Sequence, residues 1–341
     1  MQKNVTIKTI AEAVGMSMSG VSKALNDYPD INEETKRIVI EKAIELGYTP
    51  NLNARNLVKN TSNSIGLIVK DTDTSYGELI KDLSRVAESN GLNLLIADSD
   101  RNRETEIKHV RSMLESRVKG IIIVPVSGEV SEIKKAVGFR VPIVFLGGWV
   151  TSPKENVVAQ DNGCGTNMAM DYLFGLGHRD IAYVSDKVRS NSNQVKIDEY
   201  TKRMREAGLE PAVFIDEGSG MVESGSRQTA RMLDSGSRFT AILASKDLVA
   251  IGAMEEIRSR NLSVPEDISV MGFGGTAMSS LPMIDLTTIA QPKKDIAENL
   301  IRILNAQSEA GHDAIPKHYF ARPELIERKS CRQVSASNRN S

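Results

Sequence analysis

The sequence predicts a multidomain chain in which a small all-α head precedes an α/β core of two lobes. Three observations support this prediction. Near the N-terminus, apolar residues recur at helical spacing on both sides of Gly15. From Ser64 onward, short apolar runs alternate with amphipathic segments, a pattern typical of βαβ units and parallel sheets. This alternation runs through two successive series, so we expect two doubly wound lobes.

Two short helices around a tight turn are predicted between residues 6 and 26. Thr6 and Ser17 are expected to cap them, with Gly15 in the turn. Val21 and Leu25 of the second helix are expected to face inward. The outward-facing residues are then Met18, Ser19, Ser22 and Lys23. This is a helix-turn-helix pattern, whose second helix enters a DNA major groove. Two core helices of an ordinary bundle would show the same spacing, so the pattern alone leaves both interpretations open.

A third helix is predicted after the turn at residues 27–30. Asn32 is its expected N-cap, and Gly47 is expected to end it. Three helices around one small core would form a compact head. The apolar face of the third helix is predicted to consist of Ile40, Ala43, Ile44 and Leu46.

Composition and charge set limits without indicating a function. With 341 residues the chain is long enough for two or three domains. Residues 1–60 carry eight Lys or Arg and seven Asp or Glu, so their charge permits DNA binding without indicating it. Cys164 and Cys331 are too few for a disulfide framework and are expected to stay reduced. Because the sequence shows neither a bilayer-length apolar run nor a signal peptide, we expect no membrane partner and a cytoplasmic location.

Motifs for catalysis, cofactors or metals are weak in this sequence. Residues 163–165 and 272–275 are rich in glycine but lack the complete dinucleotide fingerprint, and we interpret the first as a loop crossing between lobes. The four histidines have no cysteine or acid at zinc spacing. Neither a G-x-S-x-G elbow nor a Walker loop is present. We therefore expect no enzyme activity and no cofactor.

Several segments resemble a known family in order and spacing. VSKALND, NEETKRIVIEKAIELGYTPN and ARNL are similar to the head of the LacI/GalR family of bacterial transcription regulators. In the core, DNGCGTNMAMDYLFGLGHRDIAYV, ASKDLVAIGAM and VPEDISVMGF followed by LTTIAQP extend the resemblance over nearly the whole chain. It implies a two-lobed core of the periplasmic-binding-protein type I architecture. It also implies a homodimeric regulator of near-palindromic, double-stranded operator DNA, most often a repressor of carbohydrate or related catabolic genes, with a small effector in the interlobe cleft.

The resemblance also implies a domain organisation, with the chain crossing between lobes near Asp161, Gln291 and Arg322. The residues after Cys331 are polar and contain no leucine heptads, which favours a dimer over a coiled-coil tetramer. The expected domains are a head at 1–49, a hinge helix and linker at 50–63, an N-lobe at 64–160 with 291–321, a C-lobe at 161–290 with 322–330, and a disordered tail at 331–341.

Residues 50–60 form a polar linker by composition, but the resemblance implies a short hinge helix in the DNA minor groove. There Leu57 matches the leucine that wedges between base steps. The family usually has threonine and arginine where this chain has Gly20 and Lys23, so its operator is expected to differ from a typical one. The expected DNA-contacting residues are Thr6, Ser17, Met18, Ser19, Ser22, Lys23, Asn26, Asn51, Ala54, Arg55 and Leu57.

The cleft departs from the family pattern. Acids are common in the family where this chain has Gly147 and Gly274. Fewer carboxylates weaken the case for a neutral sugar, since such acids accept paired hydrogen bonds from sugar hydroxyls. Lys196 and Lys246 stand where arginine and asparagine are usual, and two lysines favour an anion such as a sugar phosphate or an organic acid.

Two alternatives remain open for the cleft. Both lysines could instead point to solvent, or the cleft could have lost small-molecule control. Aromatic side chains could supply stacking faces for an effector, expected to be a sugar or a sugar derivative. The expected effector-binding residues are Ser75, Tyr76, Trp149, Lys196 and Lys246. The competing function is a two-lobed small-molecule-binding protein without a DNA role, against which the head and the missing signal peptide argue.

Overall fold

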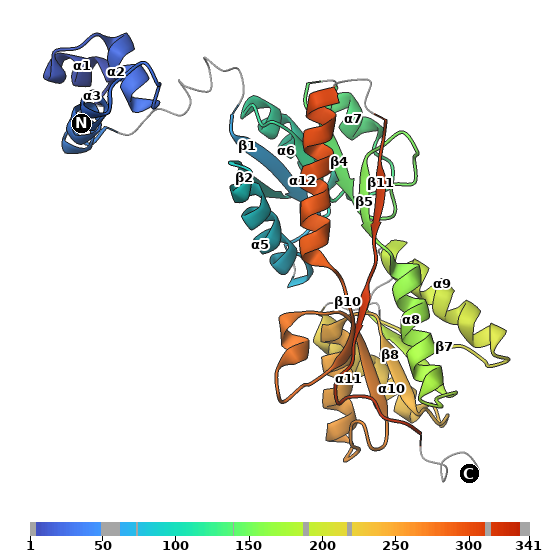
Figure 1. Ribbon diagram of the computed structural model, residues 1–341. Helices are drawn as coiled ribbons and strands as arrows, with labels where there is room; N and C mark the ends of the chain where they lie inside the picture. The colour runs from blue at the N-terminus through green and yellow to red at the C-terminus, as the bar shows by residue number, and fades with distance from the viewer. Residues whose placement is uncertain are drawn as a thin grey trace. The chain divides into compact units, whose positions relative to one another are not determined.

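The computed structural model describes residues 5–48, 62–72, 74–138, 140–186, 191–216, 220–310 and 315–334 (Figure 1). The chain divides into two compact units, residues 1–62 and residues 63–341. Among the described residues, no helix is long and apolar enough to cross a membrane.

The first unit contains three helices around a small core: α1 (Ile7–Val14), α2 (Met18–Leu25) and α3 (Glu33–Glu45). The Thr6 hydroxyl accepts the Thr9 N–H at 3.3 Å and so caps α1. The Ser17 hydroxyl accepts the Gly20 N–H at 3.0 Å and caps α2. Between the helices, Gly15 has a φ of 68°, in the left-handed region that favours glycine. The predicted caps and turn are therefore confirmed.

The predicted apolar face of α3 is only partly right. Ala43 is buried, but Ile40 is 44% exposed and Ile44 is 73% exposed. The side chains that α3 buries instead include Val39 and Lys36. Lys36, Val39 and Ala43 follow the i, i+3, i+7 spacing of one helix face, whereas the two isoleucines lie on the next row around the helix. The row with Lys36 was not predicted to face the core because lysine is charged, although the aliphatic part of a lysine side chain can be buried.

The second unit contains two six-stranded sheets. The strand order is β11-β5-β4-β3-β1-β2 in the sheet of the N-lobe, and all its neighbouring strands are parallel. Its elements are β1 (Ser64–Val69), α5 (Thr74–Ser89), β2 (Asn93–Asp98), α6 (Arg103–Glu115), β3 (Ile121–Ile123), α7 (Ser131–Val137), β4 (Ile143–Leu146), β5 (Val157–Gln160), α12 (Lys293–Ala310) and β11 (His318–Ala321).

The sheet of the C-lobe has the order β12-β10-β9-β8-β6-β7. Only its β10–β12 pair is antiparallel among the described strands. Its elements are α8 (Asn162–Gly175), β6 (Ile181–Ser185), α9 (Asn191–Glu206), β7 (Ala212–Ile215), α10 (Met221–Asp234), β8 (Ala241–Ala244), α11 (Asp247–Ser259), β9 (Ser269–Gly274), η1 (Ala277–Ser280), β10 (Thr287–Ala290) and β12 (Glu324–Ile326).

Helices cover both faces of each sheet, and the central strands are buried almost throughout. Leu83 of α5 and Leu300 of α12 pack with Ile122 on one face of the N-lobe sheet, while Val110 of α6 and Ile133 of α7 lie in the core on the other. Figure 1 shows α12 running along this sheet, although it follows the strands of the C-lobe in the sequence. Continuous apolar runs such as 65–69 are what a doubly covered parallel sheet requires.

Two interpretations of the core need correction. Residues 163–165, interpreted as a loop crossing between lobes, form the first turn of α8, because the Asp161 carboxylate accepts the Cys164 N–H at 2.8 Å and caps that helix. A Cβ on Gly165 would overlap Phe273, so glycine there allows α8 to lie close to the sheet. The strands β5, β10, β11 and β12 were not predicted, because each contains polar residues, such as Gln160, Thr287 and Glu324, that interrupt its apolar run.

The start of the predicted disordered tail is also wrong. The Cys331 thiol donates to the Val270 carbonyl at 3.3 Å, and the Arg332 N–H donates to the Ser269 hydroxyl at 3.1 Å. The Val334 N–H donates to the Leu176 carbonyl at 2.9 Å. Residues 331–334 are polar in sequence but hold to the C-lobe mainly through backbone groups, which composition does not reveal. Residues 335–341 lie outside the described part of the chain.

Candidate DNA-binding head and effector cleft

The outer face of α2 carries the side chains predicted to contact DNA. Met18 is 56% exposed and Ser19 is exposed, while Ser22 and Lys23 are half-buried. The inner face buries Val21, as predicted, together with Ala24 in place of the predicted Leu25, which is only half-buried. The accessible surface of α2 is therefore formed by the outer-face side chains Met18, Ser19, Ser22 and Lys23.

Several of the predicted contact residues already have partners within the head. Thr6 and Ser17 use their hydroxyls as helix caps. The Asn26 side chain donates to the Ser22 carbonyl at 2.7 Å. The Lys23 ammonium is hydrogen-bonded to the Asp30 carboxylate, which raises the pKa of Lys23. Contact with DNA would have to add to these interactions or replace them. The predicted hinge contacts Asn51, Ala54, Arg55 and Leu57 lie outside the described residues.

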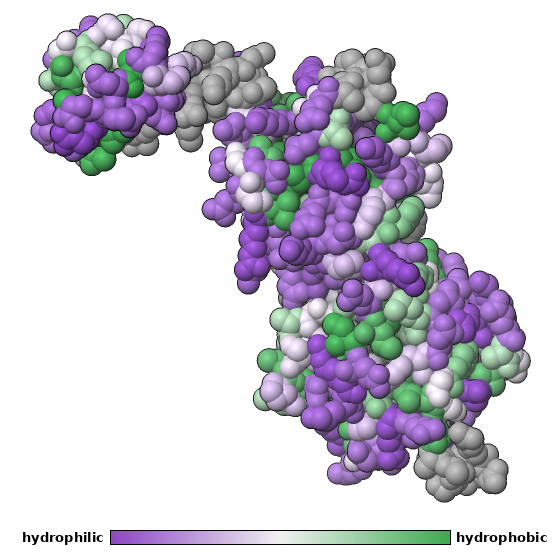
Figure 2. Space-filling view, viewed as in Figure 1, coloured by the Kyte–Doolittle hydropathy of each residue, from purple (hydrophilic) through white to green (hydrophobic). Residues whose placement is uncertain are grey.

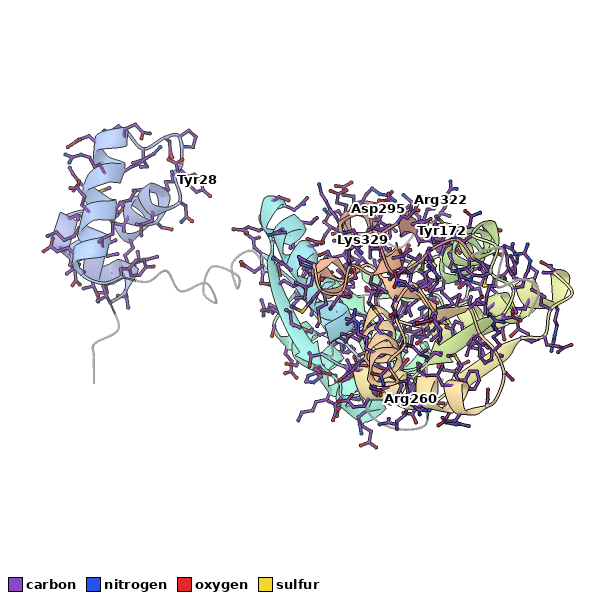
Figure 3. All side chains as sticks on the ribbon, turned by 90° about the horizontal axis from the view of Figure 1, so that it is seen from below. Tyr28, Tyr172, Arg260, Asp295, Arg322 and Lys329 are labelled. Atoms are coloured by element: carbon purple, nitrogen blue, oxygen red, sulfur yellow. The ribbon has the colours of Figure 1, made fainter. Side chains whose placement is uncertain are left out.

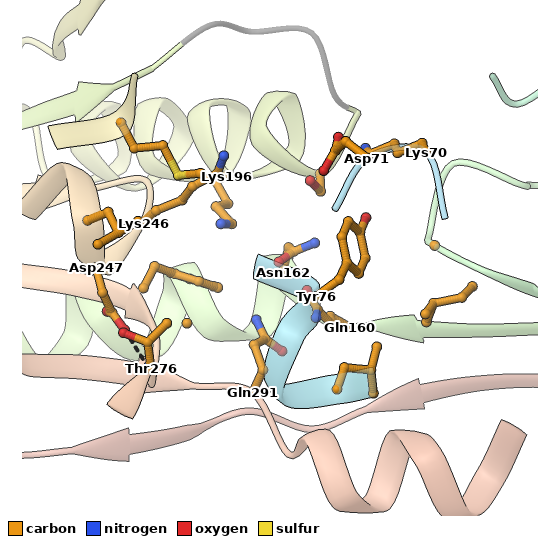
Figure 4. Close-up of a pocket in the computed structure, with 18 of the residues that line it drawn as sticks. Lys70, Asp71, Tyr76, Gln160, Asn162, Lys196, Lys246, Asp247, Thr276 and Gln291 are labelled. Atoms are coloured by element: carbon orange, nitrogen blue, oxygen red, sulfur yellow. Dashed lines mark hydrogen bonds between the residues drawn. The ribbon is translucent and has the colours of Figure 1, made fainter. Parts of the chain in front are cut away.

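A cleft of about 660 Å³ lies between the two sheets of the core (Figure 4). Much of its wall follows the carboxyl ends of parallel strands, where open α/β sheets bind ligands. From the N-lobe come Lys70 and Asp71 after β1, Tyr76 on α5, Arg101 after β2, and residues 147–149 after β4. From the C-lobe come Asp186 after β6, Lys196 on α9, Lys246 and Asp247 after β8, and Phe273 and Gly274 at the end of β9.

Lys196 is the most enclosed basic side chain of the cleft wall. It is 8% exposed, and its Nζ donates to the Ser245 carbonyl at 2.9 Å. The same Nζ lies 3.8 Å from the centroid of the Phe273 ring. Burial, together with the nearby Lys246, lowers the pKa of Lys196 to about 7. The alternative in which both lysines point to solvent is therefore wrong for Lys196.

Lys246 differs from Lys196 because it has an acidic partner. Its Nζ donates to the Asp186 carboxylate at 2.9 Å, and its side chain is 34% exposed. Asp247, the next residue, accepts from the Thr276 N–H at 2.6 Å and from the Thr288 hydroxyl at 2.6 Å. Lys246 thus belongs to the cleft wall as a neutralised pair, while Asp247 holds the end of β9 to β10.

Trp149 occupies the space beside Gly147 on the N-lobe wall. A Cβ built on Gly147 would overlap the Trp149 ring, and the φ of Gly147 is 136°, which favours glycine. The indole N–H donates to the Pro125 carbonyl at 3.2 Å, and the Lys70 Nζ lies 4.6 Å from the ring centroid. An acid at position 147 would collide with this ring. Tyr76 also lines the cleft, whereas the Ser75 side chain lies outside the described part of α5.

Two amide side chains in the cleft were missed as candidate site residues. Gln291 and Asn162 are each 8% exposed and line the cavity (Figure 4). Both amide atoms of Gln291 and the Oδ1 of Asn162 have no hydrogen-bond partner among the described residues. An unpaired buried amide costs free energy, so these atoms require a partner. Gln291 lies in the motif LTTIAQP and Asn162 in DNGCG, and both motifs indicated the fold. The polar amides within these motifs were the signal that could have identified them as site residues.

A polar link joins the two lobes beside the cleft. The Glu78 carboxylate on α5 accepts the Ala277 N–H of η1 at 2.7 Å. Its other oxygen pairs with the Lys293 Nζ at 2.6 Å. Lys293 also donates to the carbonyls of Gly274 and Gly275, at 3.1 and 3.0 Å. The Glu78 carboxylate thereby links α5 to the segment that follows β9.

Metal binding finds no support in the described residues, which contain no group of three or more His, Cys, Asp or Glu able to hold an ion. The buried His178 is instead a structural residue. Its ring nitrogens lie 2.9 Å from the Thr240 hydroxyl and 3.1 Å from the Arg332 carbonyl, and burial lowers its pKa to about 4.

Comparison with known proteins agrees with the two units. Residues 6–51 match the bacterial regulatory proteins of the lacI family, and residues 170–331 match a periplasmic binding protein-like domain. The chain is 30% identical over 306 residues to catabolite control protein A of Priestia megaterium, which covers 88% of this chain and 92% of that protein. The chain belongs to the LacI family. A PurR transcriptional repressor of Glaesserella parasuis is 29% identical over 339 residues, covering 97% and 99% of the two chains.

Solved structures of LacI-family members show the same architecture. The lac repressor dimer bound to operator and the anti-inducer ONPF has a TM-score of 0.86 and 27% identity, covering 97% of this chain and 100% of that chain. The predicted fold class, a helix-turn-helix head with a two-lobed α/β core, is confirmed. The chain is a DNA-binding transcriptional regulator, and the relatives named here are regulators or repressors rather than enzymes.

Proposed function

We propose that this regulator acts as a homodimeric repressor of carbohydrate or related catabolic genes, and that an anionic small molecule in the interlobe cleft controls it. The head contacts near-palindromic operator DNA through the outer face of α2. The exposure of this face supports the proposal, since the side chains of Met18 and Ser19 are exposed and that of Ser22 is half-buried. The relatives support the repressor role, since they include a catabolite control protein and the lac repressor.

The observation that carries the effector proposal is that both amide atoms of Gln291 and the Oδ1 of Asn162 have no hydrogen-bond partner among the described residues. Both residues are more than nine-tenths buried and line one cavity with side chains from both lobes. A ligand with hydroxyl or acid oxygens would supply the missing hydrogen bonds. The volume of about 660 Å³ suits a ligand of sugar size or somewhat larger.

The charge of the cleft favours an anion over a neutral sugar. Five basic and three acidic side chains line the described wall. Arg101, Lys246 and Lys293 are each paired with a carboxylate. Lys196 forms no ion pair among the described residues, and its partners are a carbonyl and an aromatic ring. A phosphate or carboxylate would give this buried ammonium the countercharge it lacks.

A thermal-shift screen tests the effector proposal. Sugar phosphates and small organic acids should raise the apparent melting temperature, while the parent neutral sugars should not, because only a ligand bound to the native state stabilises it. Lys196→Met should remove most of the shift. Lys294→Met is the matched control, since Lys294 is 79% exposed on α12 and should leave the shift unchanged. Stabilisation by neutral sugars alone would contradict the proposal.

A further inference from the structure

Lys23 is the basic residue of α2, and an acid of the following loop holds it. No other Lys or Arg lies between Met18 and Leu25. The Lys23 Nζ is hydrogen-bonded to the Asp30 Oδ2. On the outer face of α2, the one formal cation is therefore neutralised within the free head.

The loop that carries Asp30 is fixed against α2. The Tyr28 N–H donates to the Lys23 carbonyl at 3.1 Å, and the Ile31 N–H donates to the Tyr28 carbonyl at 3.2 Å. Asp27 pairs with Lys36 of α3 at 2.6 Å, which ties the start of the loop to the third helix. Figure 3 shows Tyr28 in this loop between helices of the head. The backbone hydrogen bonds of this loop therefore hold Asp30 near Lys23.

The pair is accessible to competitors. The Lys23 side chain is 44% exposed and that of Asp30 is 52% exposed. An exposed ion pair is weak and sensitive to salt, so the two acceptors of a guanine edge held beside Lys23 can replace the carboxylate. The pair raises the pKa of Lys23 and lowers that of Asp30, so both groups are charged at neutral pH. Because an ammonium has three donors, a contact of Lys23 with DNA either adds to this pair or replaces it, and only replacement frees the full charge of Lys23.

We propose that Asp30 sets the DNA affinity and specificity of the head by withholding Lys23 from the phosphate backbone. The proposal rests on the proposed DNA-contacting role of α2. On random DNA, Lys23 stays paired with Asp30 and adds no phosphate contact. On the preferred site, a fixed guanine edge with two acceptors draws Lys23 away from Asp30. Asp30 therefore lowers non-specific binding more than specific binding.

The two kinds of duplex give different expected responses to Asp30→Asn. On random duplex the variant gains a phosphate contact, so affinity should rise about fivefold to tenfold and the salt dependence should steepen by about one ion. On the preferred duplex Lys23 is already in contact with DNA. There the affinity should rise less than about fivefold, which is the cost of breaking the ion pair, with an unchanged salt slope.

The experiment measures binding of the full chain by fluorescence anisotropy at several salt concentrations. The probes are the best-bound duplex selected from a random library by the wild-type chain and a random-sequence duplex. Asp30→Asn and Asp30→Ser are each tested alone and with Lys23→Ala, and thermal unfolding checks that each variant is folded. Glu41→Gln is the matched control, because it removes an exposed head carboxylate that pairs with Arg37 at 3.0 Å and not with Lys23.

The proposal is supported if the gain on random duplex disappears in the Lys23→Ala background. A gain that persists there, or an equal gain from Glu41→Gln, would mean general charge repulsion and would overturn it. Loss of affinity at one base pair would make Asp30 a base contact and overturn it too, as would no change at all. If Lys23→Ala leaves both affinities unchanged while the wild-type chain still protects its selected site from DNase I, the contact role of Lys23 itself fails.

Discussion

Lys196 combines a structural cost with a proposed role in effector binding. Its amine is buried against Phe273, and the pKa of Lys196 falls from the usual 10.5 to about 7. In the unfolded chain the group keeps its usual pKa, so between about pH 7 and 10 the unfolded state binds more protons than the folded state. The penalty of burying this lysine is therefore full below about pH 7 and declines as the pH rises.

This gives a prediction for the unliganded protein. Relative to Lys196→Met, the wild-type chain should gain stability as the pH rises from about 7 to 9, by at most about 1.4 kcal/mol per pH unit. The measurement is urea unfolding of both proteins at several pH values. Lys294→Met, which alters an exposed lysine, should show no such difference from wild type. A difference between wild type and Lys196→Met that does not depend on pH would contradict the burial of this charge.

At the scale of elements, the sequence predicted features such as helix caps, which depend on residues close together along the chain. Thr6 and Ser17 were recognisable as caps because their partners lie three residues away. Gln291 and Asn162 were missed as site residues because their lack of partners follows from how the end of β10 and the start of α8 come together at the cleft wall, which no local pattern encodes. The burial of Lys196 was likewise left open, since helical spacing does not reveal which side chains face α9 from β8.

The link between α5 and η1 leads to a prediction at the same scale. Glu78→Gln keeps an oxygen for the Ala277 N–H but removes the charge that pairs with Lys293. The pair is partly exposed, so the loss of stability should be about 1 kcal/mol or less, while amide hydrogen exchange around Ala277 should become faster. Glu298→Gln removes an exposed carboxylate beside Lys294 on α12 and should leave that exchange unchanged. Equal exchange in both variants would show that Glu78 does not hold the lobes in place.

At the scale of the whole core, two clusters of exposed apolar side chains lie apart from single ones such as Val195 and Phe320. Leu95 and Ile96 are 37% and 47% exposed on β2, an edge strand of the N-lobe sheet. In and after η1 of the C-lobe, Met278 and Met283 are 43% and 78% exposed. The Glu78–Ala277 hydrogen bond brings η1 next to α5. The helix α5 connects β1 to β2, and these two strands are neighbours in the N-lobe sheet. Both clusters therefore lie toward the same side of the core. Figure 2 shows that hydrophobic areas interrupt a largely hydrophilic surface on the face in view.

A second copy of the chain is the occupant that the proposed function calls for on this side. Ile96→Glu would place a charge in that contact, so the variant should sediment as a monomer at concentrations where the wild type is a dimer. Its affinity for a near-palindromic duplex should fall at least tenfold, because two linked heads bind such a site far more tightly than one. Phe320→Glu is the matched control, since Phe320 is 53% exposed on β11, the opposite edge of the same sheet. Dissociation by Phe320→Glu and not by Ile96→Glu would place the dimer contact at the other edge.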